Sequence, residues 1–264
     1  MLKIENVRKV FNAGTVNEKV ALNGLDLELK EGDFVTVIGG NGAGKSTMLN
    51  SVAGVYPVDE GRILIDGVDV TGLPEYKRAK FIGRVFQDPM MGTAATMQIE
   101  ENLALAARRG KPRTLRSGIT KQEREDYREK LKILDLGLED RLTAKVGLLS
   151  GGQRQALTLL MATLQEPKLL LLDEHTAALD PKTAAKVLEA TQRIVERSNL
   201  TTLMITHNMR DAITYGNRLI MMYNGHVVVD VSGEEKKNLT VEQLLALFSE
   251  ASGSDEANDK LLLS

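Results

Sequence analysis

The sequence predicts an α/β protein with a mostly parallel core sheet, an N-terminal antiparallel β region and an inserted helical lobe. Three observations lead to this class. Strand-like runs follow one another in residues 1 to about 70, helical patterns fill residues 98 to 164, and strands alternate with helices after Pro167. Consecutive strands favour antiparallel pairing, whereas strands that alternate with helices are typical of a parallel sheet.

The N-terminal region carries two signals of an antiparallel sheet. Leu25, Leu27 and Leu29 alternate with charged residues, as in a strand with one buried face. The run from Ile63 to Ile65 ends at Asp66-Gly67, a dipeptide typical of tight hairpin turns. We therefore expect neighbouring strands in this region to pair antiparallel.

Residue spacing typical of a helix cap indicates helices in the lobe, about residues 98–164. Thr120 and Glu123 have the spacing of a capping box, in which each side chain bonds the backbone N–H of the other residue. A further helix is expected from Arg154 to Leu164.

The last third of the chain ends in a hairpin and a helix. Asn224-Gly225 predicts a two-residue hairpin turn, and Thr240 with Gln243 predicts the cap of a last helix. Before them we expect strands at Leu169–Leu172, Thr201–Thr206 and Leu219–Tyr223 and a helix at Thr183–Ser198. Residues 1–249 are assigned to one domain and residues 250–264, which are mostly small and polar, to a flexible tail.

Composition narrows the classes of function. The 264 residues carry a formal net charge of −2, which argues against the basic field of a nucleic-acid binder. The chain lacks cysteine, so disulfides are excluded and a cytosolic location is favoured. The aliphatic run Leu169–Leu172 is far shorter than the roughly 20 residues of a membrane-spanning helix, so work at a membrane would need a partner that spans it.

A glycine-rich loop lies between the apolar run Phe34–Ile38 and a helical run that starts at Lys45. Its sequence, Gly39-Gly40-Asn41-Gly42-Ala43-Gly44-Lys45-Ser46, matches G-x-x-x-x-G-K-[ST], the phosphate loop of P-loop NTPases. Backbone N–H groups and the positive end of the helix dipole would hold the phosphates there. Lys45 adds a full charge near the β and γ phosphates, and Ser46 offers Mg²⁺ a hydroxyl ligand. The loop predicts binding of ATP with Mg²⁺.

Two acids, Asp173 and Glu174, end the predicted strand Leu169–Leu172. The carboxyl end of a parallel strand is where an open sheet presents its ligand site. Asp173 can reach Mg²⁺ directly or through water, and Glu174 can polarise the water that attacks the γ phosphate. Acids at a strand end are commonly solvated turn residues, but the phosphate loop favours the catalytic interpretation.

A second glycine turn, Leu149-Ser150-Gly151-Gly152-Gln153, opens a predicted helix and forms a second potential anion site. This pentapeptide is the signature motif of ABC ATPases, and the chain resembles that family from about Leu2 to Gly233. The resemblance implies a head-to-tail dimer in which Ser150, Gly151, Gly152 and Gln153 contact ATP held by the partner's phosphate loop. A P-loop kinase would not account for this second loop.

The other family motifs follow in the expected order. Gln87 resembles the Q-loop residue, a Mg²⁺ ligand that reports the nucleotide state to the helical lobe, and Asp180 resembles the D-loop aspartate. His207 resembles the switch histidine, whose neutral imidazole can donate a hydrogen bond to the γ phosphate. Phe11 resembles the aromatic residue that stacks on adenine, although tyrosine is more usual there and a core role fits equally well. The implied ATP site thus comprises Phe11 and the loop from Gly39 to Thr47.

The resemblance implies an ATPase with Glu174, His207, Lys45 and Gln87 at its catalytic site and Ser46, Gln87 and Asp173 as Mg²⁺ ligands. After Glu174 the family commonly has proline, whereas this chain has His175. The departure changes local rigidity and leaves the chemical assignments intact.

The single-domain format looks like a bacterial importer of the ABC transporter type. The implied function is that of an energy subunit on the cytoplasmic side of the cell membrane, which drives a small solute such as an amino acid through a separate permease. Implied partners are the permease, a second copy or a homologous ATPase subunit, and, through the permease, an extracytoplasmic solute-binding protein. The alternative is a soluble ABC-type ATPase, for example one used in cluster assembly, because such a protein shares the single domain and the motifs.

Overall fold

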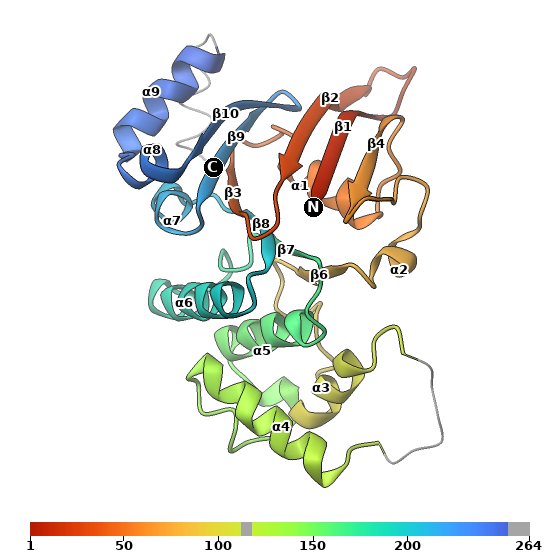
Figure 1. Cartoon of the computed structure of the whole chain (residues 1–264), viewed down its shortest axis with the longest axis vertical. Coiled ribbons are helices and arrows are strands. Elements are labelled where there is room, and N and C mark those ends of the chain that lie inside the picture. Colours follow the sequence, from red (N-terminus) through yellow and green to blue (C-terminus); the bar gives the residue numbers. More distant parts are fainter. Residues whose placement is uncertain (112–117, 253–264) are drawn as a thin grey trace. The chain divides into compact units, whose positions relative to one another are not determined.

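The computed structural model describes residues 1–111 and 118–252. These residues form two compact units (Figure 1). The first unit contains Met1–Ile82 and the segment that begins at Thr201, and the second contains Gly83–Leu200. The tail assigned from residue 250 is helical as far as Ser252, and its remaining residues lie outside the described ranges.

The first unit contains the antiparallel sheet that the alternation predicted. Its strands lie in the order β2-β1-β4-β5, and β1 pairs antiparallel with both β2 and β4. Leu2 lies opposite Leu29 on one side and Ile65 on the other, and all three side chains are buried. The bounds are β1 (Leu2–Phe11), β2 (Lys19–Leu29), β4 (Glu60–Ile65) and β5 (Val68–Asp69).

A second run of strands in the same unit has the order β10-β9-β3-β8, with β3 parallel to both of its neighbours. The bounds are β3 (Phe34–Ile38), β8 (Thr201–Ile205), β9 (Arg218–Tyr223) and β10 (His226–Ser232). Asn224 and Gly225 join β9 to β10 with φ values of 47° and 80°, the left-handed pair of a type I′ hairpin turn. The hairpin prediction is confirmed.

Helices of the first unit pack on these strands. The residues of β3 are all buried, and the Thr36 hydroxyl donates a hydrogen bond to the Ala212 carbonyl. Phe248 of the last helix is fully buried and meets Tyr223 edge to face, with ring centroids 5.7 Å apart. The bounds are α1 (Lys45–Ala53), α2 (Glu75–Arg78), α7 (Met209–Thr214), α8 (Gly233–Lys237) and α9 (Val241–Ser252).

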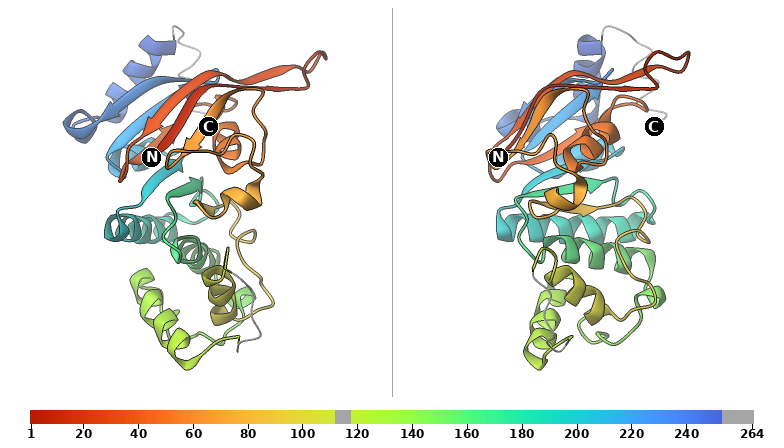
Figure 2. Two further views of the ribbon diagram at one scale, coloured as in Figure 1. Left: turned by 45° about the vertical axis from the view of Figure 1, so that its right-hand side comes forward. Right: turned by 90° about the vertical axis from the view of Figure 1, so that its right-hand side faces the viewer.

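Helices make up most of the second unit, and β6 lies beside β7. Figures 1 and 2 show α5 and α6 side by side. The Arg124 guanidinium on α4 bonds the Glu100 carboxylate on α3 at 2.6 and 2.9 Å. The bounds are β6 (Ile82–Val85), α3 (Ile99–Ala107), α4 (Lys121–Leu131), η1 (Lys132–Leu134), η2 (Val146–Leu148), α5 (Gly151–Thr163), β7 (Leu169–Asp173) and α6 (Pro181–Ser198).

Capping confirms two predicted helix starts and corrects a third. Thr120 with Glu123 and Thr240 with Gln243 make the reciprocal bonds expected of them. The expected start of α5 at Arg154 was wrong, because the helix begins at Gly151. Ser150 and Gln153 form the capping box there, so the glycines belong to the first turn of the helix rather than to a turn before it.

Candidate nucleotide site

The phosphate loop links β3 to α1 in the first unit. Gly39 has a φ of 152°, and a Cβ at this position would lie 2.3 Å from the carbonyl oxygen of Met222 on β9. Gly44 has a φ of 103°, and its Cβ would lie 2.6 Å from the carbonyl oxygen of Ala21 on β2. Both glycines are therefore required by close backbone contacts as well as by their conformation.

Lys45 begins α1 and points back into the loop. Its side chain is buried, and Nζ donates hydrogen bonds to the carbonyl oxygens of Gly39 and Gly40. A buried ammonium group needs compensation by polar partners. The carbonyl oxygens supply part of it, and a bound phosphate would add a full negative charge beside the same group.

His207 follows the strand that neighbours the loop-bearing strand. β8 runs parallel to β3, with Ile205 opposite Val37, and the Thr206 N–H donates to the Val37 carbonyl at 3.1 Å. The pairing places the backbone at His207 beside the end of β3, from which the phosphate loop starts. His207 is half-buried.

Phe11 ends β1 and makes aromatic contacts that the sequence did not indicate. Its ring meets Tyr56 edge to face at 5.3 Å between centroids, and the Lys9 ammonium lies 5.5 Å from the ring centroid. The ring remains half-buried. It is thus held in place by packing while part of it stays accessible.

In the second unit, Asp173 ends β7 and forms an ion pair with Arg84 on β6. The guanidinium Nη2 lies 3.5 Å from the carboxylate, and the two side chains are only 12% and 16% exposed. The guanidinium carbon also lies 4.6 Å from the centroid of the Phe86 ring. Sequence reasoning missed Arg84, because a single arginine inside a short strand belongs to none of the motifs.

Glu174 adopts an unusual backbone conformation. Its φ is 48°, in the left-handed region that costs a non-glycine residue about 1–3 kcal/mol. Its carbonyl oxygen accepts a hydrogen bond from the Ala177 N–H at 3.0 Å, so the chain turns sharply after β7. The next side chain, His175, is 1% exposed, and burial lowers its pKa to about 4.

The signature residues form the first turn of α5. The Gln153 N–H donates to Ser150 Oγ at 3.3 Å, and the Ser150 N–H donates to Gln153 Oε1 at 3.2 Å. Gly152 is buried against α6, where an added Cβ would lie 1.9 Å from Thr183 Cγ2. A side chain at this position would therefore push α5 and α6 apart.

A pocket of about 320 Å³ opens beside the signature residues. Ser150 and Gln153 line it together with Lys182 and Lys186 from α6, both exposed lysines that sequence reasoning did not single out. These two ammonium groups make the surface around the signature turn suited to an anion.

The remaining motif residues of the second unit lie at the ends of its elements. Gln87 is exposed two residues after β6, and the preceding residue Phe86 accepts a hydrogen bond on its carbonyl from the Gln155 side chain of α5 at 2.8 Å. Asp180 caps α6 by accepting the Thr183 N–H at 3.1 Å, and hydrogen bonds from Thr183 lower its pKa. The helix that carries the signature turn is thus bonded to the Q-loop.

The chemistry of the donor atoms fits Mg²⁺. In the first unit Ser46 is exposed and offers a hydroxyl oxygen. In the second unit Gln87 is exposed and Asp173 partly exposed, and they offer an amide and a carboxylate oxygen. Each of these is a kind of ligand that this hard cation prefers. Arg84 supplies a counter-charge to Asp173 that a bound cation would have to compete with.

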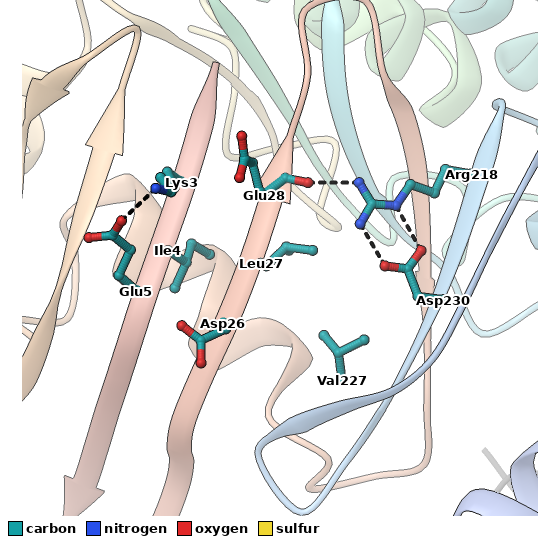
Figure 3. Close-up of a pocket in the computed structure, with 9 residues that line it drawn as sticks. All are labelled: Lys3, Ile4, Glu5, Asp26, Leu27, Glu28, Arg218, Val227 and Asp230. Atoms are coloured by element: carbon teal, nitrogen blue, oxygen red, sulfur yellow. Dashed lines mark hydrogen bonds and ion pairs between the residues drawn. The ribbon is translucent and has the colours of Figure 1, made fainter.

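A different pocket, of about 430 Å³, lies between the N-terminal strands and the β9–β10 hairpin of the first unit (Figure 3). Both cations among its lining residues, Lys3 and Arg218, are paired with carboxylates of the same pocket. Arg218 bonds both carboxylate oxygens of Asp230 and the Glu28 carbonyl, and Lys3 pairs with Glu5. This pairing leaves little positive charge for an anionic ligand, and the pocket contains none of the predicted site residues. Over residues 1–111 and 118–252, none of the helices has both the length and the apolar character needed to cross a membrane.

Known proteins resemble this chain in sequence and in structure. The profile of the family described as ABC transporter matches residues 22–177. The tyrosine transport ATP-binding protein of Clostridioides difficile is 46% identical over 251 residues, which cover 95% of this chain and all of that protein. The phosphonates import ATP-binding protein PhnC of Bacillus anthracis is 35% identical and aligns over 89% of this chain and 90% of its own length. An ATP-binding cassette solved as a dimer in a post-hydrolysis state with ADP and Pi superimposes with a TM-score of 0.74 at 32% identity, over 88% of this chain and 98% of the other.

Proposed function

The chain belongs to the ABC transporter family and is an ATPase of that family, and we propose that it powers import of an amino acid through a separate membrane permease. The observation that carries this proposal is the presence in one chain of two glycine-rich turns at helix N-termini, the phosphate loop before α1 in the first unit and the signature turn that opens α5 in the second. A second turn of this kind is expected where ATP is held between two subunits.

In this proposal the loop from Gly39 to Thr47 binds the ATP phosphates. Lys45 contributes a positive charge. Its side chain is already held inside the loop, where it is buried and bonded to the Gly40 carbonyl. The accessible part of the Phe11 ring stacks on adenine, with Tyr56 fixing its orientation.

Ser46, Gln87 and Asp173 hold the Mg²⁺ that accompanies the nucleotide. A bound Mg²⁺ would supply positive charge that offsets the negative charge of the phosphates. Arg84 keeps the Asp173 carboxylate oriented.

Glu174 accepts a proton from the attacking water, and the His207 imidazole donates a hydrogen bond to the γ phosphate. The left-handed backbone of Glu174 supports this role, because non-glycine residues in such conformations cluster at functional sites. Gln87 couples the γ phosphate to the helical lobe, and its position beside the α5-bonded Phe86 suits that coupling.

Two subunits close head to tail around ATP. Ser150, Gly151, Gly152 and Gln153 face the γ phosphate of the nucleotide bound by the partner, and Asp180 lies at the same interface. Lys182 and Lys186 add positive charge beside the signature turn. Loss of the γ phosphate on hydrolysis weakens the closed state, because the shared ligand is removed.

The permease docks on the second unit, on the cytoplasmic side of the membrane, and an extracytoplasmic solute-binding protein delivers the solute to it. Among the described residues of this unit, four large apolar side chains are exposed: Met90 and Met91 after the Q-loop, Leu148 before the signature turn and Leu105 on α3. Flexible methionine side chains are well suited to packing against a partner helix. Tyrosine is the amino acid that the 46% identical relative supports.

Uptake in cells of the source organism that lack this chain tests the proposal. Wild-type chain should restore uptake of labelled tyrosine, whereas Glu174→Gln should bind ATP and fail to restore it, because the amide cannot take the proton. Glu166→Gln is a matched control, since Glu166 is exposed and has a similar φ of 45° outside every motif. Full uptake with Glu174→Gln would refute the assignment of the base, and unchanged tyrosine uptake without the chain would refute the cargo.

A further inference from the structure

We propose that His175 is a positioning residue, which holds Glu174 in its productive conformation through a buried hydrogen bond to Thr191. This inference rests on the proposed role of Glu174 as the general base. It concerns a residue outside the motifs, two residues beyond the end of β7 and directly after Glu174.

The direction of the hydrogen bond follows from the partners of the Thr191 hydroxyl. Thr191 Oγ1 lies 2.8 Å from the Val187 carbonyl oxygen, which can only accept, so the single hydroxyl proton is donated there. The oxygen lone pair therefore accepts the Nε2–H of His175, 3.1 Å away. Both side chains are 1% exposed, so water does not offer the imidazole an alternative partner.

This bond ties the end of β7 to the middle of α6. On one side of Glu174, Leu171 and Leu172 are fully buried in the strand. On the other side, His175 is anchored to the helix. Glu174 therefore lies between the buried strand and the anchored His175. Its left-handed φ of 48° gives the backbone the turn between them.

Without the anchor, the backbone at Glu174 loses one restraint on its left-handed conformation and keeps the Ala177 N–H bond to its carbonyl, so it can relax further toward an ordinary conformation. A rotation there redirects the carboxylate, because the side chain follows the φ of its own residue. A shift of about 1 Å at a reacting group can lower a rate by about 100-fold even when substrate binding is unchanged. The anchor therefore affects turnover rather than affinity for ATP.

The test compares Thr191→Val with Thr191→Ser. Valine has nearly the shape of threonine and removes the hydroxyl, which is both the acceptor for His175 and the donor to the Val187 carbonyl, whereas serine keeps both. Thr163→Val is a matched control on α5, because the Thr163 hydroxyl is also buried and also donates to the carbonyl four residues back, Leu159, at 2.9 Å. Its hydroxyl is bonded to the backbone carbonyls of Leu159 and Leu160 instead of to a histidine.

Turnover number, KM for ATP and ATP-driven dimerisation are measured for the folded variants. Thr191→Val should lower kcat by about 10- to 100-fold with KM and dimerisation within about twofold of wild type, and Thr191→Ser should restore kcat. Thr163→Val should leave all three unchanged. Wild-type kcat in Thr191→Val would overturn the proposal, as would a parallel loss of ATP affinity or dimerisation, which would assign the bond to the fold or the interface.

A second pair of variants covers a failure of Thr191→Val to fold. His175→Gln keeps an N–H donor and should retain most of the turnover, whereas His175→Phe keeps a ring without a donor and should lose it. Equal activity of the two would overturn the proposal. Glu174→Gln in the same assay separates the two hypotheses: wild-type turnover there removes the general base, whereas an inactive Glu174→Gln beside a fully active Thr191→Val removes only the role of His175.

Discussion

Arg78→Met should destabilise the first unit by about 3–5 kcal/mol, because Arg78 closes the far end of the helix that starts at the phosphate loop. The side chain is 2% exposed. It donates to the carbonyl oxygens of Ser51 and Val52 in the last turn of α1 at 2.7 and 2.9 Å, and to those of Leu73 and Thr71 at 2.8 and 2.9 Å. Each buried acceptor that loses its partner costs about 1–3 kcal/mol.

The expected total is less than the sum of four such losses, since the variant also avoids burying a guanidinium charge. Methionine fills most of the space and donates no hydrogen bond. Urea unfolding followed by circular dichroism measures the change as a shift in midpoint at constant slope.

Arg8→Met is the matched control. Arg8 has a side chain that is 43% exposed and a single ion pair with Glu60, worth about 0–1 kcal/mol. A loss below about 1 kcal/mol for Arg78→Met would refute the reasoning that these four bonds stabilise the first unit by joining the end of α1 to Thr71 and Leu73.

Three further predictions follow from single contacts. The folded-state pKa of His175, about 4, lies below its ordinary 6.5, so the unfolded chain binds a proton that the folded chain excludes and stability falls as the pH drops through this window. Wild type should lose about 2 kcal/mol more than His175→Gln between pH 7 and pH 5 in thermal unfolding, and equal losses would contradict the burial argument. Gly152→Ala should destabilise by about 1–3 kcal/mol, because its Cβ would overlap Thr183 Cγ2, and Thr183→Ser in the same chain should restore stability in urea unfolding; no restoration would exclude this clash as the cause. Arg84→Met should bind Mn²⁺ several-fold more tightly in the presence of ATP, by electron paramagnetic resonance of free Mn²⁺, because it removes the cation that pairs with Asp173. Arg62→Met is the control, because Arg62 is an exposed arginine that pairs with Glu5 in the first unit. Weaker binding by Arg84→Met, with binding by Arg62→Met unchanged, would mean that orientation by Arg84 outweighs its competition with the metal.

Sequence reasoning succeeded where the signal is local. The Thr120 and Glu123 capping box and the Asn224-Gly225 turn each depend on backbone positions a few residues apart. The phosphate loop was recognisable because its glycines, lysine and serine must follow in a fixed order. The start of α5 was misplaced although its signal is local, since two glycines look like a helix-breaking turn while the Ser150 and Gln153 spacing predicts a cap.

The residues that support the site could not be predicted in the same way. Arg84 meets Asp173 and Arg78 meets Ser51 only because the fold brings strands and helices together over long separations in sequence. His175 was visible as a departure from proline, but its partner is determined by how β7 and α6 pack. Such contacts depend on tertiary packing, which residue spacing does not encode.

Isolation of the tagged Glu174→Gln chain from native membranes in MgATP, followed by mass identification of what co-purifies, tests the transport assignment most directly. The account predicts a polytopic membrane protein in stoichiometric amount with the chain. Recovery only from the soluble fraction, with soluble partners alone, would contradict it and would favour the ABC-type ATPase that is not engaged in transport.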